Sequence, residues 1–167
     1  MFVREKNIVL MQGVFESSLF DLISKRKDKD YFILEGRPGL EAAKQSSCEF
    51  LKRNIQPTVI SDNMAGFLFY RNLVKEVWLS YQMVNAKGAL CQIGGLILGV
   101  LGYRHKIPVY LYPSPLNRQM IASQKKIKCF NGVRVVTGRI SGYVPLLEWV
   151  PKKYIGKVYG KQPAPKS

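Results

Sequence analysis

The chain has 167 residues, 47% apolar content and a formal net charge of +15. This length allows one domain with a substantial core and leaves no room for a second full domain of ordinary size, and the apolar content excludes global disorder. The longest apolar run, Ala89–Tyr103, contains Gln92 and four glycines, so it is too short for a membrane span and predicts a buried helix. No signal peptide precedes the first predicted strand, so we expect a cytoplasmic protein with no membrane contact.

The positive charge is unevenly distributed along the chain. From Arg118 to the end, eleven Lys or Arg residues accompany one acid, Glu148, which gives +10; the first 117 residues hold fifteen basic and ten acidic residues, which gives +5. This asymmetry indicates an anionic partner near the C-terminal third, and RNA or the ribosome is one candidate. A solubilising surface or the lysine-rich habit of a thermophile remains the alternative, because "KKIK" at 125–128 matches no recognised nucleic-acid-binding motif.

Short apolar runs alternate with segments of helical spacing along the chain. Helical spacing runs over Phe15–Lys27, over Leu40–Leu51, from Asp62 through Phe69 with Asp62 as a plausible N-cap, and over Cys91–Tyr103. The predicted strands are Asn7–Gly13, Tyr31–Glu35, Thr58–Ser61, Glu76–Ser80 and Ile107–Pro113. This alternation predicts an α/β fold, a Rossmann-like, doubly wound and mainly parallel sheet in a single domain.

Ligands on such sheets bind beyond the carboxyl ends of the strands. Those ends carry Gln12-Gly13, Glu35–Arg37, Ser61–Asn63, Tyr81-Gln82 and Tyr112–Ser114, which form the candidate site from pattern alone. The glycine-rich nucleotide fingerprint and the phosphate-loop lysine motif are both missing from the sequence, and Cys48, Cys91 and Cys129 lack metal-ligand spacing. We therefore expect no cofactor and no metal, and three buried thiols in a reducing compartment.

Three stretches carry a family resemblance: "ILEGRPGLEAAKQ", "VISDNMAG" and "NLVKEVWLSYQMVNAKG". They resemble the Rossmann-type C-terminal domain of the initiation factor 2B alpha/beta/delta family, which includes methylthioribose-1-phosphate isomerase and ribose-1,5-bisphosphate isomerase. "YVPLLEWVPKKYI" at 143–155 is similar to the closing pattern of that family. The resemblance implies a domain over residues 1–155, a basic, flexible tail over 156–167, and no counterpart of the family's usual helical N-terminal domain.

The resemblance also implies which positions correspond to the isomerase site. The isomerases' cysteine falls on Gly13 and their aspartate on Gln82; their Asn-Lys pair falls on Cys91-Gln92, and a glutamine after Arg-Pro falls on Glu41. Arg37 is the expected phosphate ligand, with a surface ion pair to Glu35 or Glu41 as the alternative. The expected ligand-binding set is Arg37, Glu41, Asp62, Asn63, Gln82, Cys91 and Gln92.

These replacements predict a protein without the isomerase chemistry. Isomerising an aldose phosphate to a ketose requires groups that exchange protons near neutral pH, which Gln82 and Gly13 cannot do. The leading hypothesis is a non-catalytic initiation factor 2B-like protein that acts in translation initiation through protein association, as a homodimer or with a related family subunit, with residual sugar-phosphate or nucleotide binding. An isomerase with an altered active site and a basic RNA- or ribosome-associated protein are the alternatives. The apolar stretches 67–70 and 110–112 are candidate contact surfaces, or plain core.

Overall fold

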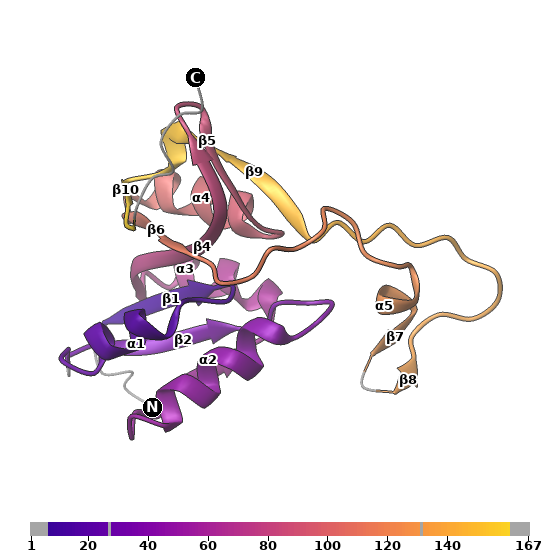
Figure 1. Ribbon diagram of the computed structural model, residues 1–167, viewed down its shortest axis with the longest axis horizontal. Helices are drawn as coiled ribbons and strands as arrows, with labels where there is room; N and C mark the ends of the chain where they lie inside the picture. The colour runs from indigo at the N-terminus through magenta and orange to yellow at the C-terminus, as the bar shows by residue number, and fades with distance from the viewer. Residues whose placement is uncertain (1–6, 27, 131, 161–167) are drawn as a thin grey trace.

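The computed structural model describes residues 7–26, 28–130 and 132–160. Its main sheet is twisted, with parallel strands in the order β10-β6-β4-β1-β2-β3, and β5 and β9 extend it from β4 as antiparallel neighbours (Figure 1). The strands are β1 (Ile8–Gln12), β2 (Asp30–Leu34), β3 (Thr58–Ile60), β4 (Val74–Asn85), β5 (Gly88–Gln92), β6 (Val109–Pro113), β9 (Leu147–Pro151) and β10 (Lys157–Val158). The predicted doubly wound, mainly parallel sheet is confirmed.

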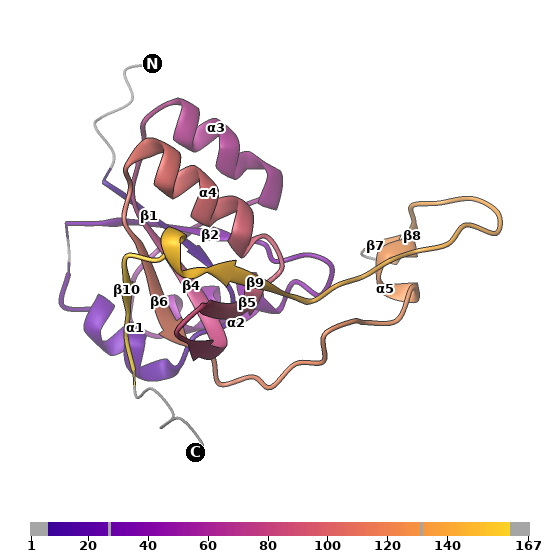
Figure 2. The ribbon, with the colours of Figure 1, turned by 90° about the horizontal axis from the view of Figure 1, so that it is seen from above.

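Helices cover both faces of this sheet, as Figure 2 shows. The helical elements of the body are α1 (Ser17–Ile23), α2 (Glu41–Leu51), the 3₁₀ turn η1 (Asp62–Met64), α3 (Ala65–Tyr70), α4 (Gly95–His105) and the 3₁₀ turn η2 (Lys152–Tyr154). On one face α1 and α2 bury Phe20 and Phe50 against β1 and β2, and on the other α3 and α4 bury Phe69 and Leu98. Within the described residues, no helix has the length and apolar character to cross a bilayer.

The segment before α4 differs from the sequence prediction. Residues 88–92 form strand β5, which is paired with β4 on one side and β9 on the other, so Cys91 lies in a strand and the helix begins only at Gly95. A short, mostly apolar run fits a buried strand as well as a buried helix, and only the pairing partners distinguish the two. The sheet also continues past the expected domain end at 155, because β10 pairs with β6 inside the segment assigned to a tail; residues 161–167 lie outside the described part.

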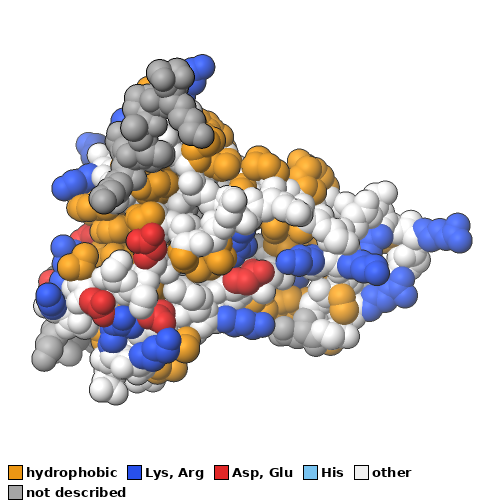
Figure 3. Space-filling model, in the orientation of Figure 1, with side chains coloured by type: hydrophobic (Ala, Val, Ile, Leu, Met, Phe, Trp, Pro, Cys, Tyr) orange, Lys and Arg blue, Asp and Glu red, His pale blue; other side chains and the backbone are white. Residues whose placement is uncertain are grey.

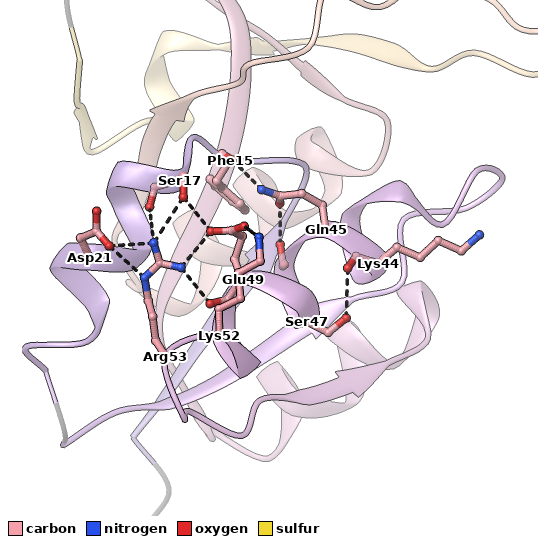
Figure 4. A network of polar contacts seen from close by, with 10 residues as sticks. Phe15, Ser17, Asp21, Lys44, Gln45, Ser47, Glu49, Lys52 and Arg53 are labelled. Atoms are coloured by element: carbon pink, nitrogen blue, oxygen red, sulfur yellow. Dashed lines mark hydrogen bonds and ion pairs between the residues drawn. The ribbon is translucent and has the colours of Figure 1, made fainter.

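A polar network joins α1 to α2 (Figure 4). The Arg53 guanidinium donates to the Asp21 carboxylate at 2.7 and 2.9 Å and to the Glu49 carboxylate at 2.8 Å, and the Ser17 hydroxyl and Lys52 ammonium also reach Glu49. The hydrogen bonds from Lys52, Ser17 and Arg53 lower the pKa of Glu49 to about 2. This network links α1 to α2 on the face of the sheet opposite α3 and α4.

Between β6 and β9 the chain makes a long excursion, which we call the arm (residues 114–146). It contains α5 (Lys125–Lys128), β7 (Cys129–Phe130) and β8 (Val133–Arg134), and both ribbon views show it running outward from the sheet (Figures 1 and 2). Its two legs pair near the body, where Ala122 N donates to Val144 O at 2.9 Å and Leu146 N donates to Met120 O at 2.8 Å. The sequence analysis did not predict this element.

Candidate functional site

The loop after β2 is held by the carboxylate of Asp62. Its two oxygens accept the backbone N–H groups of Gly36 at 2.9 Å and Arg37 at 2.8 Å. The prediction that Asp62 is a helix N-cap is therefore wrong: Asp62 is the first residue of η1, the N-cap position is Ser61, and the Asp62 carboxylate bonds the loop after β2 instead. A carboxylate that bonds two successive N–H groups fixes the loop path, which places Arg37 and Glu41 at the same end of the sheet.

At the end of β1, Gly13 has φ +108 and lies against Ser80 of β4. A Cβ atom at Gly13 would be 1.8 Å from the Ser80 hydroxyl oxygen and 2.7 Å from its Cβ. Ser80 is itself buried. The space that a side chain at position 13 would need is thus already filled by the neighbouring strand, and the left-handed backbone disfavours a side chain there as well.

Gln82 lies within β4, which continues to Asn85, at the point where the neighbouring β6 ends at Pro113, and its side chain is engaged with the arm. Its amide oxygen accepts the backbone N–H of Arg118 at 2.8 Å, and its amide nitrogen donates to the Arg118 carbonyl at 3.4 Å. The side chain thus bonds both backbone groups of one residue, as a strand neighbour would, and it anchors the outgoing leg of the arm where the arm crosses the strand ends.

The arm and Glu41 at the start of α2 line an open pocket of about 460 Å³. Arg118 and Lys126 from the arm face Glu41 from α2 across it, at 3.7 and 3.8 Å. Beside the pocket, the Arg37 guanidinium lies 3.9 Å from the centroid of the Phe130 ring on β7. The two cations outnumber the one facing carboxylate, so the pocket has a net positive charge.

Two buried glutamines lie beneath the strand ends. Gln12 donates to the Ile93 carbonyl at 2.6 Å. Gln92 lies close to Gly36, since a Cβ atom added at Gly36 would be 2.8 Å from the amide nitrogen of Gln92. Both side chains are at least 95% buried, and neither amide oxygen has a hydrogen-bond partner within the described residues. An unpaired buried acceptor costs about 1–3 kcal/mol, so these oxygens are suited to accept a donor from water or a ligand.

The start of α4 is capped by a carboxylate from another strand. Glu148 of β9 accepts the backbone N–H groups of Gly94 at 2.6 Å and Leu96 at 2.9 Å, which occupies the anion-attracting end of the helix with a side chain of the protein. Cys91, opposite Glu148 in the sheet, packs into the main core, and burial raises the pKa of its thiol to about 12. Cys48 and Cys129 are exposed, so the prediction of three buried thiols is wrong for two of them.

The predicted residues thus divide into three groups. Arg37, Glu41, Asp62, Gln82 and Gln92 gather at the carboxyl ends of the strands; Asn63 is exposed and accepts only the Ser61 hydroxyl among the described contacts; Cys91 belongs to the core. The sequence analysis missed Arg118, Lys126 and Phe130, because their positions depend on the course of the arm. Their only sequence signal is the basic composition of the segment after Arg118.

Known proteins share both the sequence pattern and this fold. A model of the initiation factor 2 subunit family matches residues 9–159. A methylthioribose-1-phosphate isomerase of Thermus thermophilus is 28% identical over 133 residues, which are 72% of this chain and 40% of that protein. The isomerase of Albidiferax ferrireducens is 38% identical over 78 residues, which are 46% of this chain and 22% of that protein.

Two solved structures match nearly the whole chain. 5-Methylthioribose 1-phosphate isomerase from Pyrococcus horikoshii has a TM-score of 0.78 at 20% identity, over 92% of this chain and 49% of its own. Translation initiation factor eIF-2B, subunit delta, from A. fulgidus has a TM-score of 0.78 at 15% identity, over 93% of this chain and 52% of its own. At these identities the likeness shows the fold alone, and the chain spans about two fifths of the length of the first isomerase relatives that it matches.

Proposed function

Because the chain belongs to the initiation factor 2 subunit family, we propose that it is a non-catalytic member of that family that acts through association with another protein chain. The observation that carries this proposal is the engagement of Gln82. At the strand end where the related isomerases are expected to have a proton-exchanging carboxylate, an amide pairs with the backbone of Arg118 through both its oxygen and its nitrogen.

The second expected catalytic position supports the same conclusion. A thiol at Gly13 would collide with Ser80, and a primary amide at position 82 exchanges no proton near neutral pH. Cys91, the thiol nearest in the fold to this end of β4, is buried in the core and has a raised pKa. These contacts support a structural role for this end of the sheet, where Gln82 binds the backbone of the arm.

The pocket lined by Glu41, Arg118 and Lys126 supports residual binding of a phosphorylated small molecule. Arg118 and Lys126 offer two cations against one carboxylate, and a phosphate could replace Glu41 as their partner. Glu41 itself opposes that binding by like-charge repulsion. The expected affinity is therefore weak, and the Glu41→Gln variant should bind phosphate more tightly than the parent.

For association, the exposed side of α3 and α4 is the surface that we propose. The two helices lie side by side on one face of the sheet (Figure 2), and their outward sides expose large apolar side chains. The exposed fractions range from 41% to 79% for Met64 of the adjoining turn η1 and for Phe67, Tyr70, Ile97, Val100 and Tyr103 of the two helices. Several exposed large apolar side chains on two neighbouring helices are typical of a protein contact. The other candidate stretch is partly covered, because Tyr159 stacks on Tyr112 at 4.7 Å.

An activity assay tests the first half of the proposal. The purified chain, incubated with methylthioribose-1-phosphate, should form no ketose above background, and the Gln82→Ala variant should be indistinguishable from the parent. Turnover that depends on Gln82 would show that the amide takes part in chemistry and would refute the non-catalytic assignment.

Light scattering tests the second half. We expect a two-fold symmetric dimer at micromolar concentration, which persists at high salt because its contact is apolar. Phe67→Glu should dissociate it. The matched control is Leu22→Glu on α1, since Leu22 is equally exposed at 59% but lies on the opposite face of the sheet. A parent that is monomeric at every salt concentration would contradict self-association through this surface.

A further inference from the structure

The arm combines concentrated positive charge with little structure of its own. Between Ser114 and Leu146 the sequence has six Lys or Arg and no Asp or Glu. The arm contains one four-residue helix and one hairpin of two-residue strands, and its apolar side chains at 121, 133, 135 and 140 are 48% to 65% exposed. A hairpin without a covering layer is marginally stable in water, so an element of this kind gains order from a partner.

Most of the arm's cations are free to meet that partner. Arg118 and Lys126 face Glu41 on the body, but the remaining four have no ion pair within the described residues: Lys125, Lys128, Arg134 and Arg139. Three of these four are exposed, and basic side chains crowd the outer part of the arm in Figure 3. Six of the eleven cations that composition assigned to the C-terminal third therefore lie on one projecting element.

A second copy of this chain is a poor electrostatic partner for the arm. Two arms placed together would repel each other, and many of the body's carboxylates are already engaged. Asp21 and Glu49 pair with Arg53, Glu76 pairs with Lys29, and Asp62 and Glu148 bind backbone N–H groups. The unpaired cations of the arm therefore favour an anionic partner from outside the chain.

We propose that the arm binds single-stranded RNA, with Lys125, Lys128, Arg134 and Arg139 on the phosphates and Tyr143 against a base. Tyr143 lies on the returning leg and is 76% exposed, which leaves its ring free to stack. Several cations together with an exposed aromatic ring are the combination that holds an unpaired strand, since the RNA backbone supplies negative charge and each base supplies an aromatic face. This proposal is independent of the non-catalytic assignment and of the α3–α4 contact.

The salt dependence of binding tests it quantitatively. In fluorescence anisotropy with a labelled RNA of about 20 nucleotides, four phosphate contacts predict a slope of about −3 in a plot of log affinity against log salt, or about 50-fold weaker binding between about 50 and 200 mM salt. Replacing the four arm cations by glutamine should flatten the slope and abolish binding at the higher salt. A matched control variant loses the same charge from exposed positions of the body, at Arg71, Lys75, Arg104 and Lys152, and should keep most of the affinity.

Polyglutamate, as the second probe, distinguishes RNA from an acidic protein. Tyr143→Ala should weaken RNA binding roughly 5- to 100-fold, as expected for one lost stack, and should leave polyglutamate binding unchanged. Unchanged circular dichroism and thermal midpoints would show that the variants fold. Three results would each overturn the proposal: no RNA binding at the lower salt, equal losses in the arm and body variants, or polyglutamate that binds as tightly as RNA and competes with it at equal charge.

Discussion

Introducing at Gly13 the thiol that the family resemblance implies for the isomerases should destabilise this fold severely. A Cβ at position 13 would lie 1.8 Å from the Ser80 oxygen, where ordinary contacts begin at 3.4 Å, and the residue has φ +108. Overpacking of a buried site costs about 1–3 kcal/mol and a left-handed backbone about 1–2 kcal/mol more, so Gly13→Cys should cost roughly 2–5 kcal/mol. For a chain of this length the melting temperature should fall by about 4–20 °C.

Differential scanning calorimetry and urea unfolding measure this loss, and a second background separates its two causes. In a Ser80→Gly variant the collision is removed, so the same change at Gly13 should cost only the backbone share, about 1–2 kcal/mol. An equal cost in both backgrounds would show that Ser80 is not the obstacle. A Gly13→Cys protein as stable as the parent would refute the predicted collision with Ser80. It would also refute the conclusion that this fold has no space for a thiol at position 13.

Three further predictions concern the polar contacts and the thiols. Because the pKa of Glu49 falls from 4.5 to about 2 on folding, its carboxylate stabilises the fold fully above pH 4.5 and loses that effect as the pH falls toward 2. Measured by urea unfolding, Glu49→Gln should therefore lose less stability over that pH range than the parent. The same dependence of unfolding free energy on pH in both proteins would contradict this. Glu148→Ala leaves two N–H groups at the start of α4 without their partner and should lower the free energy of unfolding by about 1–2 kcal/mol, whereas a loss within error would show that water replaces the carboxylate at no cost. In the native protein a maleimide should label Cys48 and Cys129 but reach Cys91 only in urea, and mass spectrometry that finds three labels on the folded chain would be the contrary result.

Local patterns in the sequence determined the fold class and the position of the strand ends. The apolar runs that became β1, β2, β3 and β6 are bounded by polar or glycine-containing turns, and their alternation with helical spacing permits only a mainly parallel sheet with helices on both faces. The presence of an amide rather than a carboxylate at Gln82 is likewise a property of the sequence. These features depend on the identity and spacing of residues that are neighbours along the chain, so the sequence alone is sufficient to predict them.

Only the tertiary structure decided what the strand-end residues do. Gln82 binds the backbone of Arg118, 36 positions away, and Ser80 fills the space beside Gly13 because β4 lies next to β1. The run around Cys91 became a strand because β4 and β9 offer edges on both sides of it. Likewise, composition reports that the C-terminal third contains eleven cations, but not that six of them lie on the arm or that two of those six face Glu41 of the body. Pairing between distant segments sets each of these outcomes, and no local pattern records which segments will meet.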